Sequence, residues 1–235
     1  MKQKTKQIVA LCLDIAVFAL MVLSVFFMMF GVQFMGEDLA LVASKAEAFK
    51  FFTVDSNVLM GLVALLYAVY LVLLLAGKID AIPHWLHVLK LVGTVGVSLT
   101  FLTVVAFLAP FVAPTFWSLF TNASFFMHFL TPVLSIVVYV FFEDTDDVRF
   151  RETFWGLVPM GVYAIFYSVN ALTHAVDGKV PYEYDWYAFV QGGVWQMAIV
   201  LPLMLVATYL IALVLWVGNL GVCRARIRRD RKSVV

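Results

Sequence analysis

The sequence is poor in charged residues. Asp, Glu, Lys and Arg make up 13% of the 235 residues, whereas hydrophobic residues make up 64%, and the mean hydropathy is +0.99. Soluble domains usually carry about 25% charged residues, so this composition excludes an ordinary soluble protein. The length suits one compact bundle better than several domains.

Cysteines and known catalytic motifs are also scarce. The two cysteines, Cys12 and Cys223, lie beside the basic termini, so we expect reduced thiols and no disulfide framework. The sequence has no P-loop, no Gly-x-Ser-x-Gly elbow and no His-Glu-x-x-His pair. His84 and His87 have the spacing of a metal pair, but no Cys or acidic residue accompanies them in a known ligand pattern. We therefore expect no metal and no cofactor.

Long apolar stretches dominate what is present. About 20 apolar residues are enough to cross the hydrocarbon layer as a helix, and the first stretch is too long for a cleaved signal peptide. The stretches fall at residues 8–34, 51–76, 86–109, 122–142, 154–176 and 187–217. The sequence thus predicts an all-α integral membrane protein, with a six-transmembrane-helix bundle in residues 1–217 and a basic tail in residues 218–235.

The positive charges indicate an orientation. In this topology 13 Lys and Arg residues fall on the side of the two termini and 3 on the opposite side, which predicts a cell-membrane protein with both termini in the cytosol. The basic tail is expected to bind anionic lipid of the inner leaflet rather than nucleic acid. Asp14, inside the first stretch, is interpreted as a snorkelling or cap-like residue near the inner interface.

Polar side chains from several helices are expected to meet in the outer half of the bundle. On the fifth stretch they recur at intervals of four, three and four residues, which is one helical face. The candidate residues are Thr53, Asp55, Ser56 and Asn57 on the second stretch, His128 on the fourth, Tyr163, Tyr167, Asn170 and His174 on the fifth, and Gln191 and Gln196 on the sixth.

Structural roles could explain several of these residues. Thr53 and Ser56 could cap the second helix, and spacing alone favours that role. Asn57 could be an interhelical link, and Asp55 could pair with a loop lysine. His128 could be a packed histidine as well as a functional one. His174 lies near the surface, which favours an interfacial role.

Two short motifs carry a family resemblance. Phe52-Thr53-x-x-Ser56-Asn57 and His128-x-x-x-Pro132 resemble the androgen-induced-gene / androgen-dependent TFPI-regulating protein family of six-helix membrane proteins, and most closely its prokaryotic relatives. Pro159-x-x-x-Tyr163 and Pro181-Tyr182-x-Tyr184 extend the likeness over nearly the whole chain. The resemblance implies a threonine hydrolase that cleaves fatty-acid esters of hydroxy fatty acids. It also implies that Thr53 is the nucleophile and His128 the essential histidine, although the apolar neighbours of His128 depart from the eukaryotic pattern.

The chemistry is coherent without the family. A threonine hydroxyl attacks an ester once a base takes its proton, and a nearby imidazole is the usual base at neutral pH. Membrane lipids would then be both substrate and solvent, and the other polar residues would orient the substrate. An acyltransferase using the same acyl-threonine is one alternative. A transporter, receptor or scaffold is another, although no obvious inverted repeat supports a transporter.

Overall fold

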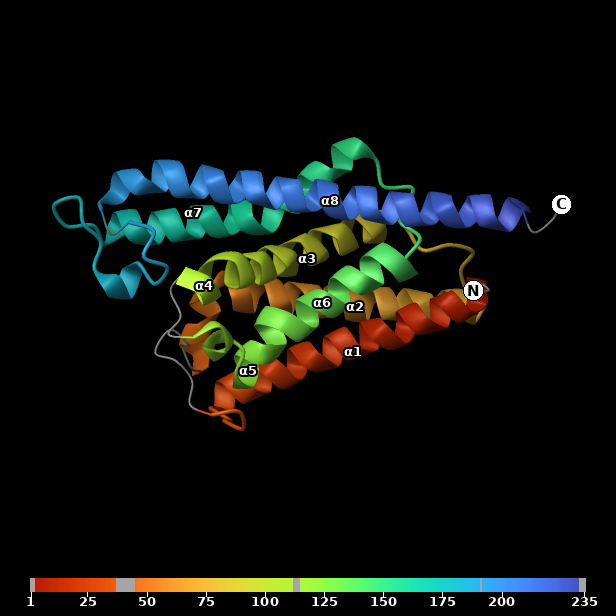
Figure 1. The fold of residues 1–235 in the computed structure, drawn as a ribbon, viewed down its shortest axis with the longest axis horizontal. Helices are drawn as coiled ribbons and strands as arrows, with labels where there is room; N and C mark the ends of the chain where they lie inside the picture. Colours follow the sequence, from red (N-terminus) through yellow and green to blue (C-terminus); the bar gives the residue numbers. More distant parts are fainter. Residues whose placement is uncertain (1–2, 37–44, 112–114, 191, 233–235) are drawn as a thin grey trace.

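The computed structural model describes residues 3–36, 45–111, 115–190 and 192–232, with the side chains of all of these except 230–232. These residues form helices and no strand (Figure 1). Six helical segments are long and apolar enough to cross a membrane: Gln3–Phe30, Phe52–Leu75, His84–Phe111, Asn122–Phe142, Phe150–Thr173 and Val194–Arg229. The predicted all-α architecture is confirmed, and the six helices long and apolar enough to cross a membrane fit a multi-pass membrane protein.

The first two spans are single helices, α1 (Gln3–Phe30) and α2 (Phe52–Leu75). The other four are composite. The third consists of α3 (His84–Thr103), the π turn η2 (Val104–Leu108) and α4 (Ala109–Phe111). The fourth consists of α5 (Asn122–Phe125), the π turn η4 (Phe126–Leu130), α6 (Thr131–Val137) and the π turn η5 (Val138–Phe142). The fifth joins the 3₁₀ helix η6 (Phe150–Leu157) to α7 (Val158–Thr173), and the sixth joins η8 (Val194–Gln196) to α8 (Met197–Lys232). Short 3₁₀ helices between spans are η1 (Lys45–Lys50), η3 (Phe116–Leu119) and η7 (Tyr182–Tyr184).

The chain termini lie at the same end of the bundle (Figure 1). We call it the terminal end; it also holds the turn between α2 and α3 and the loop of residues 143–149. The opposite end, which we call the loop end, holds the first turn of α2, α5 and the connection of residues 174–193.

Helix α3 is the centre of the bundle. In its span 61% of the most apolar window is buried, against 22–39% in the other five. Glycines bring α2 against it: a Cβ added at Gly93 would lie 3.0 Å from Sδ of Met60, and one added at Gly96 would lie 3.3 Å from Cβ of Ser56. Small residues at helix crossings allow this close approach in membrane bundles.

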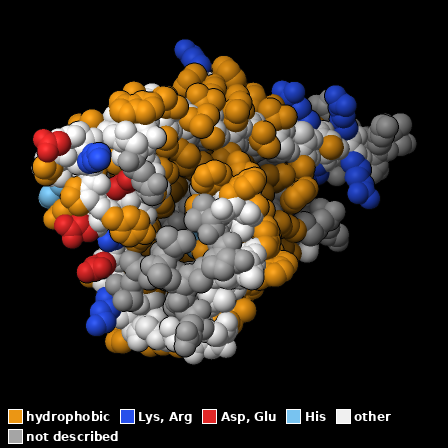
Figure 2. Space-filling view, turned by 60° about the vertical axis from the view of Figure 1, so that its left-hand side comes forward, with side chains coloured by type: hydrophobic (Ala, Val, Ile, Leu, Met, Phe, Trp, Pro, Cys, Tyr) orange, Lys and Arg blue, Asp and Glu red, His pale blue; other side chains and the backbone are white. Residues whose placement is uncertain are grey.

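The outer faces of the helices are apolar. On α7 and α8 large side chains such as Ile165, Val169, Leu203 and Val214 are more than half exposed. Hydrophobic side chains cover the flank of the bundle, and charged ones gather towards its ends (Figure 2). This distribution suits a protein surrounded by lipid.

The sixth helix differs from its prediction. It was expected to begin near Tyr187, but the regular helix begins at Met197. The carboxylate of Asp185 accepts the backbone N–H groups of Phe189 and Val190, at 2.8 and 3.2 Å, and Ala188 and Gly193 have positive φ. These contacts hold the segment as a loop although its sequence is apolar. At its other end α8 continues through residues 218–232, which the sequence analysis assigns to a tail.

The fourth span is locally distorted where a proline falls. Pro132 has no N–H group to give to the His128 carbonyl, and its ring crowds that carbonyl. The chain passes through the π turn η4 directly before α6, and His128 lies within that turn. Such turns relieve a broken helical ladder and are frequent at functional sites.

A substitution at Gly156 tests how closely η6 packs against the core. A Cβ at this position would lie 2.9 Å from Cβ of Ala212 and 3.3 Å from a methyl group of Val95. We expect Gly156→Ala to destabilise the fold by about 1–3 kcal/mol through overpacking, measured as unfolding of the purified protein in detergent. Gly161→Ala is the matched control, because a Cβ there meets nothing within 4 Å. Equal stability of the two variants would contradict this account of the η6 contact.

Candidate functional site

The start of α2 is held by a tyrosine from the opposite loop. Phe51 is its N-cap residue, and no side chain caps the helix. Instead the N–H of Phe52 donates to the hydroxyl of Tyr187 at 2.9 Å, and Thr53 and the side chain of Tyr163 also interact with that hydroxyl. The capping role considered for Thr53 and Ser56 is therefore wrong. Burial raises the pKa of Tyr187 to about 12, so its phenol stays neutral.

Ser56 and Asn57 join α2 to neighbouring helices. The Ser56 hydroxyl donates to the Thr53 carbonyl at 3.1 Å and lies 3.0 Å from the Thr100 hydroxyl of α3. The Asn57 amide donates to the carbonyls of Thr53 at 2.8 Å and Met127 at 3.1 Å. Asn57 is thus the interhelical link that the sequence suggests. Asp55 is exposed and forms no ion pair with any described residue, so the expected pairing with a lysine is not found.

His128 is oriented by the backbone. Its side chain is half-buried, and Nδ1 lies 2.8 Å from the carbonyl oxygen of Leu119. A carbonyl can only accept, so Nδ1 carries a hydrogen, and whenever the imidazole is neutral its Nε2 is the acceptor nitrogen. The ring is therefore fixed in the tautomer that can remove a proton.

Thr53 and His128 belong to adjacent segments but are not hydrogen-bonded to each other in the described part of the chain. Among the described residues no hydrogen bond joins them, because the hydroxyl lies beside Tyr187 and the imidazole bonds Leu119. The connection runs through Asn57, whose amide bonds the Thr53 carbonyl and that of Met127, the residue before His128.

The predicted polar face of α7 is present, and it holds the connecting loop. The Tyr163 hydroxyl donates to the Lys50 carbonyl at 2.6 Å and accepts from Nε1 of Trp186 at 2.8 Å. Tyr167 donates to the buried carboxylate of Asp185. These bonds pull the loop onto the start of α2, instead of lining a shared pocket with His128.

The remaining candidates contact the same loop. The Asn170 amide donates to the Tyr184 carbonyl at 2.8 Å. His174 is exposed and stacks on the Tyr184 ring, with 3.6 Å between ring centroids, as an interfacial role requires. Gln196 accepts from the N–H of Gly192 at 2.8 Å, so it shapes the turn before α8. Gln191 lies outside the described residues.

The terminal end holds a buried cluster of charges that the sequence analysis missed. The Lys90 ammonium group forms ion pairs with Asp14 of α1 and with Glu143, the latter at 2.8 Å, and all three side chains are 0% exposed. The interpretation of Asp14 as a snorkelling or capping residue is wrong. Opposite charges inside two separate apolar stretches were the available signal, because such charges usually pair inside a bundle.

A second layer of charge surrounds this cluster. Asp144 pairs with Lys6 of α1 and with Arg226 of α8. Burial alone would raise the pKa of Asp144, but its bonds to Lys6 and Gln3 hold it below the usual value.

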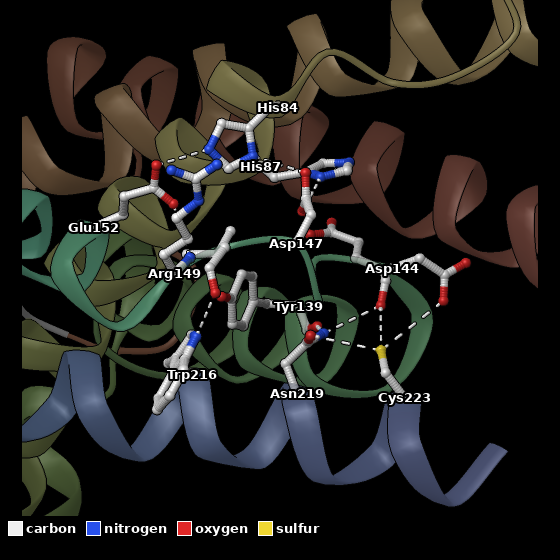
Figure 3. Close-up of polar contacts among 12 residues, drawn as sticks. His84, His87, Tyr139, Asp144, Asp147, Arg149, Glu152, Trp216, Asn219 and Cys223 are labelled. Atoms are coloured by element: carbon white, nitrogen blue, oxygen red, sulfur yellow. Dashed lines mark hydrogen bonds and ion pairs between the residues drawn. The ribbon is translucent and has the colours of Figure 1, made fainter. Parts of the chain in front are cut away.

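The two histidines of α3 are neighbours of acidic residues that the sequence does not place beside them. Asp147 lies 2.7 Å from Nδ1 of both His84 and His87, and Glu152 lies 2.8 Å from Nε2 of His84 (Figure 3). Burial opposes ionisation of Asp147, yet the two histidine bonds lower its pKa. Both nitrogens of His84 are occupied, and no group of metal ligands forms in the part of the chain that is described.

Helix α8 fixes the loop that carries these acids. The Asn219 amide donates to the carbonyls of Tyr139 and Glu143, at 2.6 and 3.1 Å, and Nε1 of Trp216 donates to the Val148 carbonyl at 2.7 Å. Figure 3 shows this loop between α8 and the histidines. The acidic groups are thereby held against α3 instead of being free in solvent.

A cavity of about 210 Å³ opens beside the cluster. Its walls combine apolar residues of α1 and α2 with Tyr67, His87, Glu143 and Asp144. This cavity lies at the terminal end, beside the buried ion pairs of Lys90.

Comparisons with protein-family models, with curated proteins and with solved structures find no match for this chain.

Lys90 tests the buried cluster. We expect Lys90→Met to destabilise the fold by about 3–5 kcal/mol, because it leaves two buried carboxyl groups without their cation. Lys78→Met, which removes an exposed lysine at the same end, should change stability by less than about 0.5 kcal/mol.

The pH dependence gives an independent check. Without Lys90 the pKa of Glu143 rises further, so the folded variant binds more protons than the unfolded chain and its stability falls as pH rises. Unfolding in detergent between pH 5 and 8 measures both effects. A Lys90→Met protein as stable as Lys78→Met at every pH would contradict the assigned role.

Proposed function

We propose that this chain is a multi-pass protein of the cell membrane with both termini in the cytosol. The supporting observation is the distribution of Lys and Arg, 13 against 3 on the two sides of the topology. Arg224, Arg228 and Arg229 project from α8 as exposed side chains. They suit contact with the anionic headgroups of the inner leaflet.

We further propose that the protein hydrolyses lipid esters with Thr53 as nucleophile and His128 as base. The observation that carries this proposal is the fixed His128 imidazole, with Nδ1 bonded to the Leu119 carbonyl and Nε2 as the acceptor nitrogen. Asn57 ties the segment of His128 to the turn of Thr53. Fatty-acid esters of hydroxy fatty acids are the substrates that the family resemblance implies.

The reaction proceeds in two steps. The Thr53 oxygen attacks the ester carbonyl while Nε2 of His128 takes the hydroxyl proton, and the alcohol leaves with that proton. Water then attacks the acyl-threonine with His128 again as base, which releases the fatty acid and restores the hydroxyl. Nucleophile and base are often apart in a substrate-free enzyme and approach only when the ester is bound.

Tyr187 supplies an oxyanion donor in this scheme. Its phenol oxygen is held by the N–H of Phe52 and lies beside the Thr53 hydroxyl. Because the phenol is neutral, its own O–H can donate to the negative charge that develops on the attacked carbonyl. Sequence reasoning missed this residue because it lies in the segment assigned to a helix.

The role of Thr53 is tested by substitution. We expect Thr53→Ala to lower ester hydrolysis on the order of 10³-fold and to abolish covalent labelling by a fluorophosphonate probe, whereas Thr53→Ser keeps labelling. Thr173→Ala is the matched control, because Thr173 is an exposed threonine at the same end that bonds only the backbone of α7 and the adjacent His174. Mass spectrometry of products and of the labelled protein gives both readouts.

The outcomes separate the alternatives. Full hydrolysis and labelling in Thr53→Ala would overturn the proposal. An acyl-threonine that transfers its chain to an added lysolipid, with no free acid formed, would identify an acyltransferase instead.

Tyr187 has a distinct kinetic signature. Tyr187→Phe keeps the ring that stacks on Phe189 but removes the donor, so kcat should fall about 10²-fold with KM nearly unchanged. The fluorophosphonate labelling rate should fall in parallel, while the free energy of unfolding in detergent falls by only about 1 kcal/mol, through loss of the bond that holds the Phe52 N–H. A change confined to KM would assign Tyr187 to substrate binding and not to the oxyanion.

A further inference from the structure

The π turn η4 leaves one carbonyl group without a helical donor. In an α-helix the carbonyl of Met127 would accept the N–H of Thr131, four residues later. Here the N–H of Thr131 donates to the carbonyl of Phe126 instead, five residues earlier, which is the π pattern. The residue five positions after Met127 is Pro132, which has no N–H. The carbonyl of Met127, a buried residue, therefore has neither its α nor its π donor.

Asn57 of α2 supplies the missing donor. Its amide nitrogen lies 3.1 Å from the Met127 oxygen and 2.8 Å from the Thr53 oxygen. Carbonyl oxygens can only accept, so the amide presents its NH₂ group to both, with one hydrogen for each. The two carbonyls depend on Asn57 to different degrees. The Thr53 carbonyl also accepts from the Ser56 hydroxyl, whereas the Met127 carbonyl has lost both helical donors.

The burial of Asn57 shows what this residue contributes. Asn57 is 0% exposed, and its Oδ1 has no hydrogen-bond partner among the described residues. A buried amide oxygen without a donor costs free energy, so an apolar side chain would suit this position better for packing alone. The advantage of Asn57 over an apolar residue therefore lies in the two hydrogen bonds that its NH₂ group donates.

The donor at Met127 also favours one register of the fourth span over another. In a continuous α-helix the carbonyl four residues before Pro132 is that of His128, and Met127 would have its own backbone donor. A side-chain donor at Met127 therefore stabilises the π turn against the α-helix. One residue corresponds to about 100° of rotation around a helix. The turn thus sets the direction of His128 relative to Leu119, whose carbonyl lies 2.8 Å from its Nδ1.

We propose that Asn57 is a positioning residue for His128: its amide holds the Met127 carbonyl and thereby maintains the π turn that orients the imidazole. The inference rests on the proposed function, in which His128 is the base. Asn57 acts through the backbone of η4 and takes no part in the proton transfer itself.

The bond to Met127 can be observed without an enzymatic assay. Met127-His128 is the only Met-His pair in the sequence, so methionine with a ¹³C carbonyl and ¹⁵N histidine together label one peptide group. Its carbonyl signal is read by NMR of the full chain in detergent. We expect Asn57→Leu to move this ¹³C signal upfield, because the carbonyl loses its donor. Asn57→Ala, which removes the amide without adding bulk, gives the same test if the leucine variant does not fold.

Asn219 provides the matched control. It is 1% exposed, and its amide also donates to two carbonyls, those of Tyr139 and Glu143, but at the terminal end. Asn219→Leu therefore removes two comparable hydrogen bonds far from η4. It should leave the labelled carbonyl signal of Met127 where it is in the natural protein.

Kinetics separate a positioning role from a purely structural one. With an ester substrate, Asn57→Leu should lower kcat about 10²-fold with KM nearly unchanged, because the base is misplaced while the substrate still binds. Fluorophosphonate labelling of Thr53 should slow in parallel. Asn219→Leu should keep the natural kcat. If Asn57 only stabilised the fold, both variants would unfold at lower temperature and neither would change kcat.

Pro132→Ala provides a rescue. It restores an N–H at position 132, so the Met127 carbonyl regains a backbone donor in either register, from position 132 in a π turn or from Thr131 in an α-helix. In this background Asn57→Leu should leave the labelled carbonyl signal where it is in Pro132→Ala alone. An equal upfield shift in both backgrounds would show that Asn57 does not replace the donor that Pro132 lacks.

The outcomes distinguish this proposal from the proposed esterase. If the natural protein hydrolyses no ester but the carbonyl signal shifts as expected, the esterase is wrong and the role of Asn57 in holding η4 is supported. An unshifted carbonyl signal in Asn57→Leu and Asn57→Ala, or a shifted signal with natural kcat, would overturn the positioning role even if hydrolysis by the natural protein is confirmed.

Discussion

The structure depends on one buried cation. The Lys90 ammonium group lies between Asp14 and Glu143, so α1, α3 and the loop after η5 are joined at a point without solvent exposure. None of the three charged side chains could be buried at this point alone, because an unpaired ion in the low-dielectric interior of a protein is strongly disfavoured. The positions of Asp14 and Lys90 therefore fix the register of α1 against α3, whereas the apolar faces of these two helices alone would allow several registers.

Buried polar groups continue along the central helix α3 as uncharged hydroxyls. Above Lys90, the hydroxyls of Thr94 and Ser98 each donate to the carbonyl four residues earlier, and Thr100 instead meets Ser56 of α2. Hydroxyls that satisfy themselves within their helix can be buried at low cost, and glycines at the same face let α2 approach. Helix α3 can thus be buried on nearly all sides while carrying polar residues along its length.

The sequence predicts the six long helices well because each is a mainly apolar run of about 20 residues or more, which has few structural alternatives in a membrane protein. Prediction from the sequence fails where contacts between distant residues determine the local structure. The described residues between Trp186 and Val194, 187–190 and 192–193, are predicted as part of a helix, but Asp185 and two positive-φ residues hold them as a loop. Thr53 and Ser56 have cap-forming side chains, yet a tyrosine 135 residues away from Phe52 holds the helix start.

The same contrast applies to the sites. The polar face of α7 was readable from its spacing, but its partner, the segment of Tyr184 to Trp186, was not, because no local rule relates residues separated by a loop. The charge count places Lys90 with the positive residues of the cytosolic side, and only the three-dimensional arrangement brings Asp14 and Glu143 to it.

The two ends of the bundle suit different chemistry because α3 separates them. Lys90 and Thr100 are ten residues apart, about 15 Å along a helix, and the side chains between them are packed and neutral. The proposed base, His128, lies at the loop end, so this layer separates it from the carboxylates of the terminal end, whose negative charge would favour a protonated imidazole. The proposed reaction and the buried charges are therefore compatible in one small protein because they lie at opposite ends of its central helix.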